Sequence, residues 1–370
     1  MKALNAWLQL LHIPGVGTRT VHKLLTHFDS VENIFAASSS ELSQCQLKPD
    51  SIEAIRNPDS SSIQKDLDWL NSAPDHHILS WQETLYPTRL KQINDAPPLL
   101  FVRGDPDYLS QPQLAIVGSR TPTASGRRAA HDFAQHLSNA GITITSGLAN
   151  GIDAASHEGA LQGIGGTVAL VAHGLDIVYP AAHQQLAQAI TQAGAVVSEV
   201  PIGTLPARGL FPQRNRIISG LSIGTLVVEA ALKSGSLITA RLAIEQNKEI
   251  FAIPGSIHNP LARGCHQLIR QGAKLVETAD DILEELSNHL KTPLASEQTT
   301  HHHKEIHTDS PQALDPDHQK LLKCLSYEPA SIDELVNLSA FSAAEIASML
   351  LIMELEGTVS SHDGRYVQVS

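Results

Sequence analysis

The stretch from Phe211 to Ala240 reads FPQRNRIISGLSIGTLVVEAALKSGSLITA. Two arginines flank an asparagine in Arg214-Asn215-Arg216, just before a short helix-like run, and a strand-like run from Thr225 to Glu229 follows. A turn of small residues, Ser234-Gly235-Ser236, then opens another helix. Guanidinium groups beside a helix N-terminus, whose backbone N–H groups lack intrahelical partners, are suited to bind phosphate. The stretch therefore predicts a phosphate-bearing ligand, either a nucleotide or a polynucleotide backbone.

Two earlier turns repeat this pattern. The apolar run Leu114 to Val117 ends in Gly118-Ser119-Arg120, and a helical pattern follows from Ala124 to Leu137. The strand-like run Thr143 to Thr145 ends in a turn that begins at Ser146-Gly147. One glycine after a strand is usually only a tight connection, although such a turn also lets backbone N–H groups approach an anion. Three turns of this kind with arginines beside them favour a binding site.

Strand-like and helix-like runs alternate from Leu114 to about Leu290, which is typical of a parallel sheet covered by helices on both faces. The segment Ser80 to Asp107 is interpreted as a bridge into this core and contains the strand-like run Leu99 to Val102. We therefore expect an α/β fold with a Rossmann-like parallel core over residues 80–290. Its further expected strands are Thr167 to Ala172, Ala195 to Ser198, Glu249 to Ile253 and Lys274 to Val276.

The same turns belong to longer segments that are specific as a set. They are Gly118-Ser119-Arg120, SGLANGIDAASH (146–157), GLDIVYP (174–180), SEVPIG (198–203), FPQRNRIISGLS, SGSLITA, FAIPGS (251–256) and RGCHQLIRQGA (263–273). In this order they closely resemble the DprA/Smf family of DNA-processing proteins. The resemblance implies binding of single-stranded DNA during natural transformation (competence), and loading of the RecA recombinase onto that DNA for recombination. It also implies a homodimer through the core and a RecA contact on its surface.

The net charge of −12 runs against the basic balance of most nucleic-acid binders. Affinity depends on the local field, however, and an acidic protein can carry one basic pocket. Basic residues concentrate in the loops and helix starts of the core, at Arg120, Arg127, Arg128, Arg208, Arg214, Arg216, Lys233 and Arg241. No apolar run reaches the ~18 residues of a membrane span, no secretory signal is expected, and the three dispersed cysteines favour a reducing, cytoplasmic location.

Residues 1–72 are expected to form a helical domain of the SAM or helix–hairpin–helix type. Apolar residues recur at helical spacing on both sides of Pro14-Gly15-Val16-Gly17. This glycine turn could present backbone N–H groups to a DNA phosphate, or it could simply permit tight packing of two helices, and the sequence leaves both interpretations open.

Two segments follow the core. Residues 291–315 are polar, contain a run of histidines, and are interpreted as a flexible linker rather than a metal site. Residues 316–370 show three helical patterns and two short strands around His362-Asp363-Gly364-Arg365, which predicts a winged helix. The third helix, Ser342 to Glu356, carries no Lys or Arg. We therefore expect this domain to contact protein rather than duplex DNA.

Catalysis is not expected, because the chain lacks a GxxxxGK[ST] loop and a GxGxxG turn. We predict no catalytic residue, no cofactor and no metal. Phe211 could stack a base or pack in the core. The predicted DNA-binding residues are Gly118, Ser119, Arg120, Ser146, Gly147, Phe211, Arg214, Asn215, Arg216, Lys233, Ser234, Gly235, Ser236 and Arg241.

Two carboxylates leave an enzymatic alternative open. Glu199 and Glu229 each end a strand and could act as acid/base groups, although without a partner nucleophile they are better interpreted as groups that orient loops. The turn after Glu229 is loosely similar to the phosphate loop of Rossmann-like nucleotide phosphoribohydrolases. A hydrolase acting on nucleoside monophosphates is therefore the alternative function.

Overall fold

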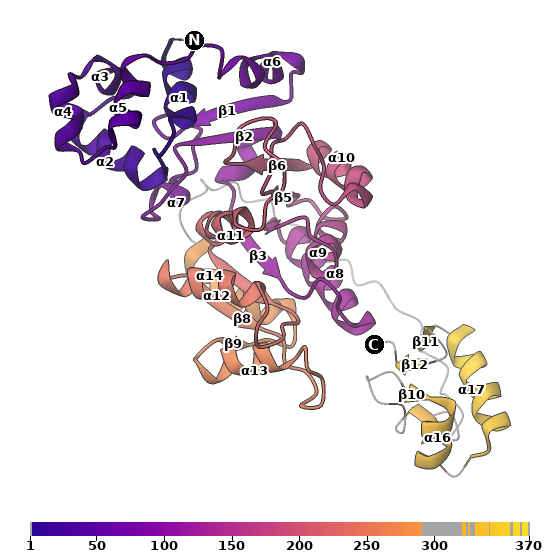
Figure 1. The fold of residues 1–370 in the computed structure, drawn as a ribbon. Coiled ribbons are helices and arrows are strands. Elements are labelled where there is room, and N and C mark those ends of the chain that lie inside the picture. Colours follow the sequence, from indigo (N-terminus) through magenta and orange to yellow (C-terminus); the bar gives the residue numbers. More distant parts are fainter. Residues whose placement is uncertain are drawn as a thin grey trace, which may run out of the picture. The chain divides into compact units, whose positions relative to one another are not determined.

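A computed structural model describes residues 2–290, 320–322, 325, 330–339, 341–355, 358–362 and 365–368 (Figure 1). The chain forms two compact units, residues 1–294 and 295–370, and each is considered by itself. The predicted linker, residues 291–315, lies outside the described residues, as do its histidines.

One sheet organises the first unit. Within residues 2–290 nine strands pair in the order β1-β2-β6-β5-β4-β3-β7-β8-β9. The seven strands from β6 to β9 along this order run parallel, as the alternation predicted. The strands are β1 His76–Ser80, β2 Leu99–Gly104, β3 Gln113–Val117, β4 Thr143–Ser146, β5 Thr167–Leu170, β6 Gly194–Ser198, β7 Gly224–Val227, β8 Glu249–Ala252 and β9 Lys274–Leu275.

The sheet is mixed rather than purely parallel. β2 pairs antiparallel with β6, and β1, which was not predicted, pairs antiparallel with β2 at the outer edge. Ile78 of β1 stands opposite Phe101 of β2. The bridge Ser80 to Asp107 therefore forms part of the sheet. The run HHILS of β1 lacks the alternation of a half-buried strand, which explains why the sequence did not reveal it.

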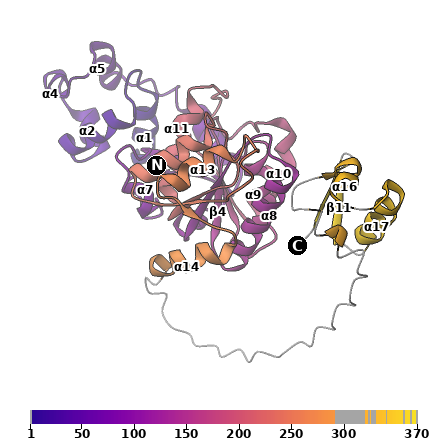
Figure 2. The same cartoon turned by 90° about the horizontal axis from the view of Figure 1, so that it is seen from below.

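Helices cover both faces of the sheet (Figures 1 and 2). On one face α8, α9 and α14 pack with Leu114 and Ile116 in a common hydrophobic cluster. On the other, α7, α11, α12 and α13 pack with Ala115 and Val117. Successive β3 residues thus face opposite clusters, as the two-residue period of a strand requires. These helices are α7 Thr88–Lys91, α8 Ala124–Asn139, α9 Ile152–Ala160, α10 Gln184–Gln192, α11 Leu210–Leu221, α12 Ser236–Glu245, α13 Arg263–Arg270 and α14 Ala279–Leu290, with 3₁₀ turns at Pro106–Ser110 and Ala181–His183.

The N-terminal residues are helical, as predicted. They form α1 Lys2–His12, α2 Thr18–Phe28, α3 Val31–Ala36, α4 Ser39–Gln44, α5 Pro49–Arg56 and α6 Gln64–Ser72. The turn between α1 and α2 is exposed; Gly15 has φ of +78°, and Gly17 is the N-cap of α2. These helices share one hydrophobic cluster with Phe101 and Val171 of the sheet side, so they pack directly on the core. Contact of the glycine turn with DNA stays a prediction.

Asp66 of α6 fixes this helical layer to the core. Its buried carboxylate accepts a hydrogen bond from Nε2 of His12 at 2.7 Å and from the backbone N–H of Ile202 at 2.9 Å. Ile202 belongs to the segment between β6 and α11. The N-terminal helices are thereby tied to a segment that leads into the predicted site.

The second unit is a winged helix, as predicted. Residues 320–322 are helical, α16 spans Ile332–Leu338 and α17 spans Ala343–Leu355. Strands β10 Ala330–Ser331, β11 Val359–His362 and β12 Arg365–Gln368 pair in the order β10-β12-β11. Leu335, Leu350 and Val359 belong to its own buried cluster. Among the described residues of both units, no helix is long and apolar enough to cross a membrane.

Candidate nucleic-acid interface

The predicted residues follow the carboxyl ends of the central strands. From β3 the chain winds through β4, β5 and β6 on one side, then crosses to β7 on the other side of β3. In open α/β sheets, the crevice beside such a reversal is where ligands bind. The turns after β3, β4 and β7 meet at this edge of the sheet.

Glu229 fills the crevice itself. Its carboxylate accepts the backbone N–H of Thr123 at 2.9 Å and the Thr123 hydroxyl at 2.7 Å. Thr123 is the N-cap of α8, and a Cβ at Gly126 would overlap the Glu229 carboxylate. The anion-binding end of α8 is thus occupied by the protein's own carboxylate. These hydrogen bonds agree with the interpretation of Glu229 as a group that orients a loop.

The turn after β3 is closely packed. A Cβ at Gly118 would collide with the Ile152 side chain, and Ser119 accepts the N–H of Ile152 at its carbonyl and the N–H of Thr121 at its hydroxyl. Gly118 and Ser119 therefore position Arg120, the exposed residue that follows them.

The turn after β4 donates a backbone hydrogen bond to the buried carboxylate of Asp153. Ser146 is fully buried and its hydroxyl donates to the Ile116 carbonyl at 2.6 Å. The backbone N–H of Ala149 donates to Asp153 at 3.3 Å, and the Gly147 N–H also points to this carboxylate. Asp153 therefore uses the Ala149 amide of this turn, and contact of Ser146 and Gly147 with a DNA phosphate stays a prediction. Burial raises the pKa of Asp153, whereas Arg214 and these hydrogen bonds oppose the rise.

Arg214 is the central cation of the site. It lies in the second turn of α11, since the helix begins at Leu210 and the motif Arg214-Asn215-Arg216 is inside it rather than before it. Arg214 is only 5% exposed, and a Cβ at Gly147 would overlap its guanidinium. Its Nε and Nη1 atoms have no hydrogen-bond partner in the structure. Burial, with repulsion from Arg120, lowers the pKa of Arg214 to about 10, while Asp153 acts in the opposite direction.

Arg120 lies above Phe211. Its guanidinium carbon is 5.5 Å from the centre of the Phe211 ring, a cation–π distance, and the Phe211 ring is 6.2 Å from that of Tyr179. Within the described residues no ion pair neutralises Arg120. Phe211 is partly buried and belongs to none of the hydrophobic clusters, so the structure keeps it at the surface of the site.

Arg216 points elsewhere. It is 7% exposed and forms ion pairs with Glu199 and with Asp95, the latter at 3.5 Å. Burial raises the pKa of Glu199, and the nearby Arg216 opposes this effect. Arg216 and Glu199 therefore neutralise each other, which agrees with the interpretation of Glu199 as an orienting group. Asn215 between the arginines is partly buried, and its carbonyl accepts from the Ser219 hydroxyl.

The remaining predicted residues lie around α12. Lys233, Ser234 and Arg241 line a groove of about 320 Å³ between α12 and α13. The hydroxyls of Ser234 and Ser236 share a hydrogen bond of 2.7 Å, and Gly235 is the N-cap of α12. In the part of the chain that the structure describes, no hydrogen bond or ion pair links this groove to Arg120 or Arg214.

Two buried imidazoles near Arg214 were missed. Nδ1 of His157 lies 2.7 Å from the Thr167 hydroxyl, which itself donates to the Ile144 carbonyl, so His157 donates from Nδ1. Nδ1 of His173 donates to the Gly174 carbonyl at 2.9 Å. Nε2 of each ring has no partner, like Nε and Nη1 of Arg214. Burial lowers the pKa of both histidines, that of His157 to about 3. The run SGLANGIDAASH contained His157, but only the fold brings it close to Arg214.

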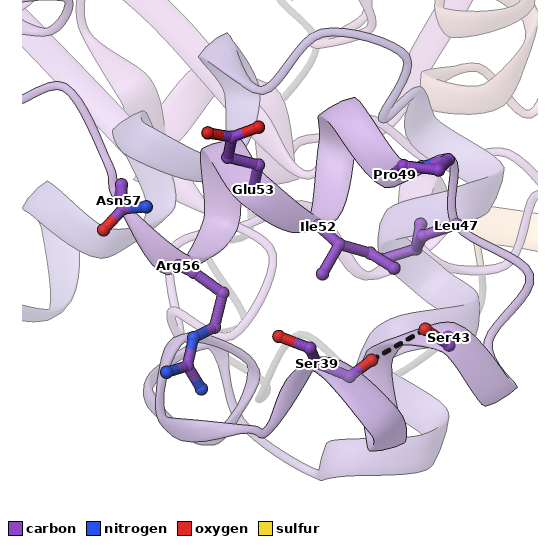
Figure 3. A pocket seen from close by; sticks show the side chains of 8 residues that line it. All are labelled: Ser39, Ser43, Leu47, Pro49, Ile52, Glu53, Arg56 and Asn57. Carbon is purple, nitrogen blue, oxygen red and sulfur yellow. Dashed lines mark hydrogen bonds between the residues drawn. The ribbon is translucent and has the colours of Figure 1, made fainter.

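The described residues hold no cluster of three or more His, Cys, Asp or Glu able to bind a metal. An open groove of about 470 Å³ lies between α4 and α5, lined by Leu47, Ile52 and Arg56 among others (Figure 3). There Arg56 donates to the Ala37 carbonyl, and the Ser43 hydroxyl to the Ser39 carbonyl. These two polar groups of the groove are therefore already hydrogen-bonded to backbone carbonyls of the N-terminal helices.

The fold is that of a Rossmann-like α/β protein, with Arg120 and Arg214 at the carboxyl edge of its central strands. The family model for DNA recombination-mediator protein A matches residues 77–287, and the model for the DprA winged helix domain matches residues 305–365. The chain belongs to the DprA/Smf family.

Relatives agree with this assignment. Protein Smf of Escherichia coli K12 is 41% identical over 310 residues, which cover 83% of this chain and 81% of Smf. The X-ray structure of DprA from Streptococcus pneumoniae has a TM-score of 0.68 at 36% identity, covering 76% of this chain and 97% of that one. A structure reported for the single-stranded DNA binding mode of DprA from Helicobacter pylori has a TM-score of 0.53 at 30% identity, covering 58% and 97%.

Proposed function

We propose that this protein binds single-stranded DNA at the carboxyl edge of its central strands. The observation that carries the proposal is the pair Arg120 and Arg214, two guanidinium groups near each other with Asp153 as the carboxylate facing Arg214. Burying a cation whose N–H groups lack hydrogen-bond partners costs free energy of folding unless an anion pairs with it. The phosphates of a DNA strand are such anions, and Phe211 lies beside them as a platform for a base.

In the cell, the protein would deliver its DNA to RecA. Membership in the recombination-mediator family supports a role in recombination, and the Helicobacter relative, whose reported subject is single-stranded DNA binding, supports the DNA-binding part of this proposal. We propose that it protects incoming strands and loads RecA during natural transformation, in the cytoplasm and without catalysing a reaction. The winged helix would contact a protein, since α17 carries no basic residue.

We also propose a homodimer. Exposed apolar side chains gather on α12 and at the edge strand β9, where Leu232, Ile238, Ile244 and Leu275 are 53%, 40%, 50% and 44% exposed. The first three line the groove that contains Lys233 and Arg241. Exposed apolar side chains that share one surface, as Leu232, Ile238 and Ile244 do in this groove, mark a protein interface. This surface fits a second copy of the chain better than it fits DNA.

The alternative, hydrolysis of a nucleoside monophosphate, is not favoured. That chemistry needs a free acid/base group beside the phosphate. Glu229 is instead held by two hydrogen bonds to Thr123, and Glu199 by Arg216.

Fluorescence anisotropy with labelled single- and double-stranded oligonucleotides over a salt series tests DNA binding. We expect tight binding that prefers the single strand. Arg120→Ala should weaken it and lower the slope of log K against log salt by about 0.7, the value for one lost phosphate contact. Arg270→Ala removes another exposed arginine, at the C-terminal end of α13, and should leave affinity and salt slope unchanged. Equal slopes for wild type and Arg120→Ala would refute the site.

Loading is tested separately. RecA filament growth is measured on single strands covered by single-strand-binding protein, with and without this protein. We expect faster nucleation that depends on Arg120. If the protein binds DNA but leaves RecA nucleation unchanged, the proposal of DNA binding stands and the proposal of RecA loading is refuted.

A further inference from the structure

We propose that Tyr179 is an outer base-stacking platform that makes the site selective for unpaired bases. This inference rests on the proposed binding of single-stranded DNA. It adds a second base-stacking residue to Phe211 and to the arginines that would contact phosphate. Tyr179 follows the carboxyl end of β5, on the loop before Ala181–His183. It therefore shares the sheet edge of the arginine pair.

Tyr179 is exposed for an aromatic residue of a well-packed core unit. Its side chain is 49% exposed, whereas Tyr86 and Phe101 of the same unit are buried. Large exposed rings are common where a surface binds a partner, because a ring offers a large contact area with few rotatable bonds. An exposed ring at the mouth of a phosphate-binding crevice matches the arrangement in single-strand binders, where bases stack on aromatic side chains beside a cationic groove.

Tyr179 and Arg120 are both neighbours of Phe211. The Tyr179 ring is centred 6.2 Å from the Phe211 ring, and the Arg120 guanidinium carbon lies 5.5 Å from the centre of the Phe211 ring. The planes of Tyr179 and Phe211 meet at 52°, so the rings are tilted rather than stacked on each other. Each ring therefore offers a face in a different direction, and two bases bound to them would be unstacked from one another. A duplex cannot present its bases in this way.

The platform is supported from within. The buried His173 ring meets Tyr179 edge-on, with centres 6.4 Å apart and planes at 80°. Nδ1 of His173 is fixed by the Gly174 carbonyl. Tyr179 is thus held in place before any ligand arrives, and a preorganised contact loses less affinity to ordering than a mobile one.

The test combines substitutions at Tyr179 with removal of the bases from the DNA strand. Affinities of wild type, Tyr179→Ala and Tyr179→Phe are measured for an oligo-thymidine and for an abasic strand of equal length. Ile164→Ala is the matched control, since Ile164 is 79% exposed and precedes β5 at the opposite edge of the sheet. Because Tyr179 is half-exposed, its truncation should leave the thermal unfolding temperature unchanged.

We expect Tyr179→Ala to weaken oligo-thymidine binding by about 5-fold to 150-fold, the range for stacking of one base. It should weaken abasic-strand binding far less, and Tyr179→Phe should bind both strands like wild type. Equal losses on both strands, or no loss on either, would overturn the inference while DNA binding itself stands. Failure of wild type to bind either strand would instead overturn the proposed function on which the inference rests.

Discussion

The Glu229 carboxylate accepts two hydrogen bonds from one residue, Thr123, whose backbone N–H lies 2.9 Å and whose hydroxyl lies 2.7 Å from it. Thr123 in turn caps α8 through a hydrogen bond from the Gly126 N–H to its hydroxyl. The carboxylate thus neutralises a helix end that would otherwise attract a phosphate. The proposed DNA site therefore relies on Arg120 and Arg214 rather than on the N-terminus of α8.

Replacing Glu229 should cost stability and spare DNA binding. Glu229→Gln places an amide N–H group against one of the two Thr123 donors, so we expect the free energy of unfolding to fall by about 1–3 kcal/mol. Affinity for single-stranded DNA should stay unchanged. Urea unfolding and anisotropy measure the two quantities. Thr123→Ala is the matched partner, and the double variant should be less destabilised than the sum of the single variants. Unchanged stability with a lost nucleotide-hydrolysing activity would instead make Glu229 an acid/base group.

Much of the fold could be predicted because its signals are local. Apolar runs such as Leu114 to Val117 and Thr225 to Glu229 have the length and composition of buried parallel strands, and helical periodicity separates them. β1 could not be predicted, because an edge strand with two histidines lacks a buried pattern of its own. Its pairing with β2 depends on partners 19 to 27 residues away.

The site was harder to predict than the fold, because residue type alone does not reveal whether a charged side chain forms an ion pair within the protein. Arg120, Arg214 and Arg216 look alike in sequence. In the fold Arg216 meets Glu199 and Asp95, which precede it by 17 and 121 residues, whereas Arg120 remains exposed. Similarly, the sequence does not reveal that Asp153 accepts the backbone N–H of Ala149 in the turn after β4. Long-range pairing decides these cases.

Arg214 and Asp153 should be coupled in stability. Arg214→Met removes the cation that offsets a buried carboxylate, so we expect a loss on the order of 3 kcal/mol in the free energy of unfolding. Adding Asp153→Asn removes the uncompensated charge and should restore most of that loss. Both variants should bind single-stranded DNA weakly, because the buried phosphate donor is gone. Urea unfolding and anisotropy on the same samples separate the two effects. Wild-type affinity in a folded Arg214→Met variant would exclude Arg214 from the ligand site.

Asp66 should hold the N-terminal helices on the core. Asp66→Ala leaves the Ile202 N–H and the His12 ring without their acceptor, and hydrogen bonds to a charged group contribute about 1.5–3 kcal/mol. We expect a loss of that size in the free energy of unfolding, and faster proteolysis in the segment around Ile202. Asp68→Ala is the control, because Asp68 lies on the same helix but is exposed. Equal effects of the two variants would show that the buried carboxylate does not join the two parts.

His157 should make the protein less stable in acid. Burial lowers its pKa from the ordinary value of 6.5 to about 3, so below pH 6.5 the unfolded chain takes up a proton that the folded chain refuses. Stability contributed by the neutral ring is complete above pH 6.5 and falls by about 1.4 kcal/mol per pH unit until pH reaches about 3. His157→Asn keeps a side-chain N–H for Thr167 but cannot titrate. Urea unfolding of both proteins from neutral pH downward should therefore show a shallower decline for the variant, and parallel declines would mean that His157 is protonated in the folded protein.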